Sequence, residues 1–190
     1  MTRINDNLCA NFTNLTTVIL PDSVTSIGNM AFSDCSKLNT LRLSNNLTEI
    51  GYQAFFDCTS LQNITLPSSL QTLDSSAFAG CTGLTNVYIP QNVTSISTTN
   101  PFASCSALET IKVHPHNTKY YSINNCLIAK DTKTLIAGCK NSIIPNDGSV
   151  VELVSTAFSR CSGLIHIEIP DSITSLNRYS FTYCSGLQTI

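Results

Sequence analysis

A phrase of about 23 residues repeats along this chain and limits what the chain can fold into. Its leucine opens successive copies at Leu38, Leu61 and Leu84, each 23 residues after the previous one. Further copies open at Leu15, Leu108, Leu164 and Leu187. A unit this short cannot bury its own apolar face, so we expect the copies to stack as a solenoid around one continuous core. Such a scaffold displays surfaces and rarely performs chemistry, and the repeat therefore indicates a binding protein.

One copy predicts the course of a single coil. Leu61, Ile64 and Leu66 alternate with polar residues, which is typical of a strand with one buried face. Ala77 and Phe78 point inward from a segment that is too short for a long helix. We therefore expect one or two helical turns there, of the α or 3₁₀ type.

The stretch from Leu108 to Leu164 departs from the period because these leucines are 56 residues apart. We interpret it as two coils with an insert at about 114–138, in which Cys139 takes the opening leucine position. Strand-like runs on both sides of residues 131–133 predict a β-hairpin in the insert.

The expected fold is thus an α/β repeat in one domain over residues 1–190. It would have a parallel sheet of about eight strands on one face, short helical turns on the other, and one inserted β-hairpin. The eight strands would begin near Leu15, Leu38, Leu61, Leu84, Leu108, Cys139, Leu164 and Leu187.

The nine cysteines favour structure over chemistry. Six of them recur at one position of the repeat: Cys35, Cys58, Cys81, Cys105, Cys161 and Cys184. Free cysteine is among the most buried residue types, so we favour buried thiols over a disulfide ladder or metal ligands. A disulfide between Cys126 and Cys139 across the hairpin remains an alternative. A metal site would need His114 and His116 with one of these cysteines, but two histidines in a short loop are more often solvated.

Composition and motifs exclude several classes of function. Charged residues make up 12% and the net charge is −2, which provides no basic field for nucleic acid. No apolar run approaches the length of about 18 residues needed for a membrane span, so we expect no membrane insertion of this segment. The sequence has no Gly-x-Ser-x-Gly, no His-Glu-x-x-His and no phosphate-binding glycine loop. We therefore expect no enzyme activity, no catalytic residues, no metal and no cofactor.

Residues 15–38 read LTTVILPDSVTSIGNMAFSDCSKL, and this pattern carries a family resemblance. It is similar to the repeat of the BspA-like leucine-rich repeat family, over nearly the whole chain. A cysteine in every coil resembles the versions found in parasitic protists. The resemblance implies a leucine-rich-repeat solenoid that acts as a non-enzymatic adhesion or recognition module. It also implies a cell-surface or extracellular location and a ligand that is a host or matrix protein, or a glycan.

The outward positions of the predicted sheet are the first candidate binding surface. The residues before and after the middle apolar residue of each strand should face solvent. The candidates are Arg42, Thr65, Tyr88, Lys112, His166 and Glu168. Large amphipathic side chains dominate interfaces, which favours Tyr88, Arg42 and His166. The alternative is that threonine-rich strands simply suit a solvated sheet.

The hairpin is the second candidate binding surface. Its tip would carry Tyr120, Tyr121, Lys130 and Lys133. The alternative is a coil that lengthened without consequence for binding.

Both ends of the chain fall inside a repeat and lack a polar capping unit. We therefore expect a segment of a longer array, whose exposed edges allow end-to-end self-association. The absent signal peptide and the unpaired cysteines favour an alternative function, an intracellular scaffold that binds proteins through the same surface. A hydrolase hidden in the insert is a third hypothesis, without any supporting motif.

Overall fold

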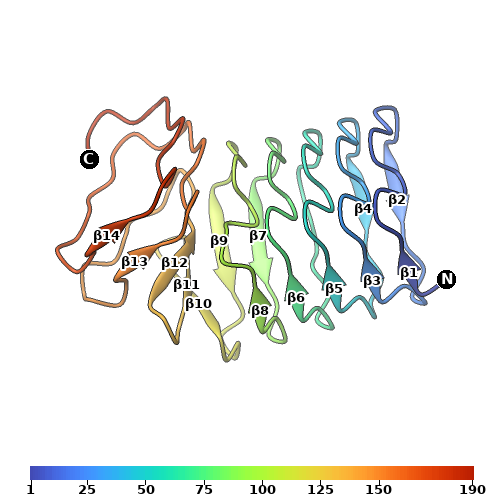
Figure 1. The fold of residues 1–190 in the computed structure, drawn as a ribbon, viewed down its shortest axis with the longest axis horizontal. Coiled ribbons are helices and arrows are strands. Elements are labelled where there is room, and N and C mark those ends of the chain that lie inside the picture. Colours follow the sequence, from blue (N-terminus) through green and yellow to red (C-terminus); the bar gives the residue numbers. More distant parts are fainter.

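A computed structural model of residues 1–190 shows a β-solenoid built from short strands and turns, without a helix. The coils follow one another along the long axis of the molecule, from the N-terminus at one end to the C-terminus at the other (Figure 1). Each regular coil has a first face, formed by the Leu-x-x-Ile-x-Leu segment, and a second face, formed by the following Val-x-x-Ile segment. The predicted solenoid is confirmed, whereas the predicted helical turns are wrong.

The first face is less continuous than predicted. Strand β2 (Thr17–Ile19) pairs in parallel with β4 (Thr40–Arg42), and β7 (Asn86–Ile89) pairs in parallel with β9 (Thr110–Val113). Isolated bridges join Asn63 to Asn86 and His166 to Thr189. The prediction of one sheet with about eight strands is therefore wrong.

The insert accounts for one of these interruptions. The segment after Cys139 forms no strand, because the N–H of Ile143 donates to the carbonyl oxygen of Asn124 at 3.2 Å. The backbone that was expected to extend the first-face sheet is engaged by the turn at residues 124–125 of the insert.

The second face carries a parallel sheet that the sequence reasoning did not predict. Its strands are β1 (Arg3–Ile4), β3 (Ser26–Ile27), β5 (Glu49–Ile50), β6 (Thr72–Leu73) and β8 (Ser95–Ile96), in that order. Ile27 lies in register between Ile4 and Ile50, and all three side chains are buried. Strands of two residues are long enough on the second face, because each coil packs only one apolar side chain of this face against the core.

Backbone geometry explains why the Ala-Phe segment is a turn. Met30 and Asp34 have φ angles of 52° and 60°, which a right-handed helix does not admit. The N–H groups of Met30 and Phe32 donate to the carbonyl oxygens of Tyr52 and Ala54 in the next coil, each at 2.8 Å. The hydrogen bonds of this turn therefore run between coils, as in a sheet.

The core between the faces is a column of stacked side chains. The ring centroids of Phe32 and Phe55 lie 5.2 Å apart and those of Phe55 and Phe78 5.1 Å apart, with nearly parallel planes. All nine cysteines are free, and the six in the repeat column line this core beside the phenylalanines. Neither a disulfide ladder nor a Cys126–Cys139 disulfide is formed.

The insert forms an antiparallel unit. Strands β11 (Cys126–Ala129) and β12 (Thr134–Ala137) make the predicted hairpin, and β10 (Tyr120–Ile123) adds a strand that was not predicted. Asn124 and Asn125 connect β10 to β11 with φ angles of 49° and 59°, as the tight turn of a hairpin requires. Beyond the insert, β12 pairs in parallel with β13 (Glu152–Leu153) and β13 with β14 (Ser175–Leu176).

The coil that carries the insert lacks an Ala-Phe turn. The backbone continues from β12 through Gly138 without a turn. The Ala-Phe turns of the preceding and following coils are therefore in direct contact. The N–H of Ser104 donates to the carbonyl oxygen of Ser159 at 3.0 Å, and Asn100 Nδ2 donates to that of Ala157 at 3.0 Å. The second-face sheet is interrupted here, because β8 and the sheet of β10–β14 are separate.

Candidate functional site

The outward side chains of the first face form a row that crosses successive coils. This outer row consists of Ile19, Arg42, Thr65, Tyr88 and Lys112, all of which are exposed. Ile19 lies in register beside Arg42, and Tyr88 beside Lys112. The structure thus brings four of the six predicted sheet-face residues together on one surface.

The other two predicted residues, His166 and Glu168, are exposed beyond the insert. His166 Nδ1 lies 2.5 Å from the hydroxyl of Thr189 in the last coil. Ile143 occupies the equivalent repeat position in the coil that begins at Cys139, and its side chain is 64% exposed. Sequence reasoning missed it, although counting four residues from Cys139 would have placed it there.

An aromatic cluster extends the outer row toward the edge of the solenoid. The rings of Tyr88 and His114 meet edge to face with centroids 6.3 Å apart, and those of His114 and His116 do so at 5.5 Å. The backbone N–H of His116 donates to Nδ1 of His114 at 3.1 Å, which occupies that nitrogen. The chain has no group of three or more His, Cys, Asp or Glu side chains that could hold a metal ion.

The two tyrosines predicted for the hairpin surface have structural contacts. Tyr120 is only 7% exposed, and its hydroxyl oxygen accepts a hydrogen bond from the N–H of Ile96 at 2.7 Å. It thereby replaces the carbonyl oxygen that a neighbouring strand would offer to β8. Tyr121 is half-buried and donates to the carbonyl oxygen of Ser149 at 3.3 Å.

The two predicted lysines are exposed and reach backbone oxygens on different segments. Lys130 Nζ donates to the carbonyl oxygen of Asn117 at 2.7 Å, and Lys133 Nζ to that of Gly148 at 3.3 Å. The four hairpin residues therefore point in different directions. Their role in binding stays a prediction.

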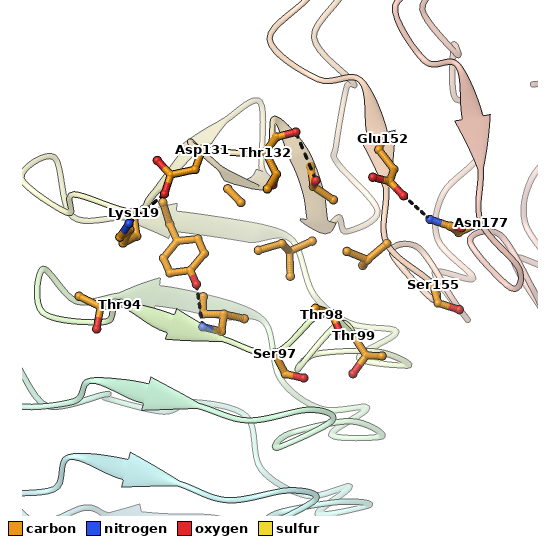
Figure 2. A pocket seen from close by; sticks show the side chains of 16 residues that line it. Thr94, Ser97, Thr98, Thr99, Lys119, Asp131, Thr132, Glu152, Ser155 and Asn177 are labelled. Atoms are coloured by element: carbon orange, nitrogen blue, oxygen red, sulfur yellow. Dashed lines mark hydrogen bonds and ion pairs between the residues drawn. The ribbon is translucent and has the colours of Figure 1, made fainter.

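A cleft of about 620 Å³ lies where the second-face sheet is interrupted. Figure 2 shows Lys119 and Asp131 at one end of this insert cleft and Glu152 with Asn177 at the other. Tyr120 forms part of its wall. Sequence reasoning missed the cleft, because no local signal reports a gap between strands that are far apart in the chain.

Burial disfavours the thiolate form of the core cysteines. Burial raises the pKa of the Cys105 and Cys126 thiols to about 12, and it also raises the pKa of Cys81 well above its ordinary value. The reactive thiolate is therefore scarce at these positions.

The structure also has no helix that could span a membrane.

Comparisons with known proteins agree with this architecture. A leucine-rich repeat protein of Eubacterium ventriosum aligns over 98% of this chain and 56% of its own, with a TM-score of 0.80 and 23% identity. The leucine rich repeat protein of T. pallidum aligns over 81% of this chain and 63% of its own, with a TM-score of 0.61 and 28% identity. The pneumococcal vaccine antigen PcpA aligns over 100% and 56%, with a TM-score of 0.77 and 20% identity. This chain therefore spans about 56–63% of the length of these proteins.

No curated protein matches the sequence. The sequence profile of the BspA type leucine rich repeat region matches it in six copies, over residues 2–130 and 134–190. Leucine-rich repeat proteins are generally non-enzymatic modules that interact with other proteins. The chain belongs to the BspA-type leucine-rich repeat family.

Proposed function

We propose that this chain is a surface adhesion or recognition module that binds a host or matrix protein through the outer row. The observation that carries the proposal is the alignment of large exposed side chains on one face. Ile19 is 63% exposed, Tyr88 48% and Ile143 64%. Exposed apolar and aromatic side chains that gather on one face are typical of interaction sites, and tyrosine is prominent among residues that dominate binding energy.

The solenoid favours binding because it orders the row in advance. Tyr88 lies in a parallel strand and packs against the ring of His114. A side chain that is already held in place loses little conformational freedom when a partner docks. Arg42 and Lys112 on either side of Tyr88 would add charge pairs with an acidic partner.

A location on the cell surface is supported by the family and by the description of PcpA as a pneumococcal vaccine antigen. A glycan ligand for the same row remains part of the proposal, since the row also carries hydroxyl groups such as that of Thr65. End-to-end self-association stays a prediction, which sedimentation at several protein concentrations would test.

Binding to immobilised fibronectin, fibrinogen and mucin tests the proposal. Tyr88→Ala is expected to raise the Kd for the bound ligand at least tenfold, and Arg42→Ala is expected to raise it less. Tyr52→Ala is the matched control, because Tyr52 is also an exposed tyrosine but lies on the Ala-Phe turn, away from the outer row. Equal losses in the Tyr88 and Tyr52 variants, or no binding to any of the three ligands, would contradict the proposal.

An intracellular scaffold is the second candidate, and the nine free thiols favour it. Unpaired cysteines are more usual in reducing compartments than outside the cell. Biotinylation of intact cells that produce the full-length protein separates the two candidates. Labelling before lysis supports the surface module, and labelling only after lysis supports the scaffold.

A further inference from the structure

A second cleft adjoins the insert cleft at the edge of the solenoid. Its volume is about 270 Å³, and its six lining residues are Gln71, Gln91, Asn92, Thr94, His116 and Thr118. Thr94 lines both clefts, which therefore adjoin, and we call the two together the insert groove. His116 connects this groove to the aromatic cluster of Tyr88 and His114.

The smaller cleft is lined by residues whose side chains are polar and uncharged, and their methylene and methyl groups form part of its wall. Carboxamides, hydroxyls and one imidazole face it, and no hydrophobic residue contributes. Such a wall offers hydrogen-bond donors and acceptors beside short apolar segments.

The larger cleft combines an apolar strip with oriented polar groups. Five of its sixteen lining residues are hydrophobic, among them Ile96, Ile136 and Val154. Hydroxyl groups come from Thr94, Ser97, Thr98, Thr99, Thr132, Thr134 and Ser155. Its volume falls within the range of about 300–1,000 Å³ that is usual for small-ligand sites.

Two carboxylates in this cleft have polar partners. Asn177 Nδ2 donates to Glu152 Oε1 at 2.9 Å and to the carbonyl oxygen of Leu153 at 2.7 Å. Lys119 Nζ lies 2.9 Å from Asp131 Oδ2, which neutralises that carboxylate. Both carboxylates lie in the lining of the cleft, where their oxygens can accept hydrogen bonds from the hydroxyl groups of a ligand.

We propose that the insert groove binds a neutral oligosaccharide. A pyranose ring has hydroxyl groups at its rim, which match the amide and hydroxyl walls, and C–H faces, which match the apolar strip. A peptide is the alternative occupant that the titration below tests. A polyanionic glycan fits less well too, since the remaining formal charge of the groove is the carboxylate of Glu152. The site is distinct from the outer row, so the two proposals can fail separately.

Calorimetric titration of the 190-residue protein with linear hexasaccharides tests this inference. The probes are cellohexaose, maltohexaose, chitohexaose and mannohexaose, with a heparin hexasaccharide and a twelve-residue threonine/valine peptide for comparison. At least one neutral hexasaccharide is expected to bind with a Kd of about 1 mM or tighter, and more tightly than the heparin fragment or the peptide.

Three variants locate the binding. Thr94→Val removes the hydroxyl that the two clefts share and is expected to weaken binding at least fivefold. Glu152→Gln keeps the shape of the side chain and is expected to weaken binding at least threefold. Thr174→Val is the matched control, because Thr174 is an exposed threonine at the equivalent repeat position but lies outside both clefts.

Tyr52→Ala, on the Ala-Phe turn and outside both clefts, should leave hexasaccharide binding unchanged. The inference is overturned if none of the neutral hexasaccharides binds. It is equally overturned if Thr94→Val and Thr174→Val behave alike, or if the peptide binds more tightly than every hexasaccharide.

Discussion

The thiol of Cys58 donates a hydrogen bond to the carbonyl oxygen of Phe32 in the preceding coil, with 3.2 Å between Sγ and oxygen. Cys81 makes the same contact with Phe55, and Cys105 makes it with Phe78, each at 3.2 Å. The repeated cysteine therefore does more than fill space in the core. It supplies a second donor to a buried carbonyl group that also accepts from the backbone N–H three residues further along its own coil.

Replacing Cys58 should reveal this donor. Cys58→Ala removes buried volume and the hydrogen bond, and we expect the free energy of unfolding to fall by about 1–3 kcal/mol. Cys58→Ser keeps a donor at the same place and should lose less. Urea denaturation followed by circular dichroism measures both. Cys9→Ala, at a half-buried cysteine in the first coil, is the control with a small expected loss. A serine variant that loses as much as the alanine variant would show that the hydrogen bond is unimportant.

The buried thiols also predict how stability depends on pH. Burial raises the pKa of Cys105 and Cys126 from the ordinary 9.0 to about 12 in the folded state. The folded protein therefore holds these protons more tightly than the unfolded chain does. Their contribution to stability is complete below about pH 9 and is lost as the pH rises from 9 to 12.

Urea denaturation between pH 7 and pH 11 checks this dependence. The free energy of unfolding should be less sensitive to pH above 9 in Cys105→Ser than in the unchanged protein, because one raised pKa has been removed. Identical slopes for the two proteins would contradict the prediction.

The hydroxyl of Tyr120 should stabilise the junction between β8 and the insert. Tyr120→Phe leaves the N–H of Ile96 without its acceptor in a buried place, and we expect a loss of about 1–3 kcal/mol in the free energy of unfolding. Tyr121→Phe is the matched control, since that hydroxyl is half-buried and makes a longer contact of 3.3 Å. Thermal or urea denaturation compares the two variants. A larger loss for Tyr121→Phe would refute this assignment.

Gly138 is required where the Ala-Phe turn is missing. A Cβ at this position would collide with ring atoms of Phe158, which is fully buried. We expect Gly138→Ala to cost about 1–3 kcal/mol or more, as overpacking of a core does. At Gly148 a Cβ meets nothing within 4 Å, but φ is +78°, so Gly148→Ala should cost only about 1 kcal/mol. Denaturant midpoints rank the two variants, and the reverse order would count against the packing argument.

The spacing of Leu38, Leu61 and Leu84 was enough to predict a solenoid, since a 23-residue unit has no other way to bury its apolar side chains. The hairpin of β11 and β12 could likewise be predicted from two strand-like runs on either side of a polar turn. The helical turn was predicted wrongly, because the short apolar pair Ala77-Phe78 has the same local pattern in a helix and in a turn.

The candidate binding surfaces, like the fold, could be predicted from the sequence only in part. The sequence alone determined which side chains face outward on the first face, because alternation along a strand is a local property. The second-face sheet and the gap between β8 and β13 were decided only by the tertiary structure. Backbone groups of the Ala-Phe turn pair with the next coil, as Phe32 does with Ala54, and only the stacked neighbour makes that geometry favourable. The insert groove exists because residues far apart in sequence, such as Thr94 and Asn177, line clefts at the site where one coil lacks its turn.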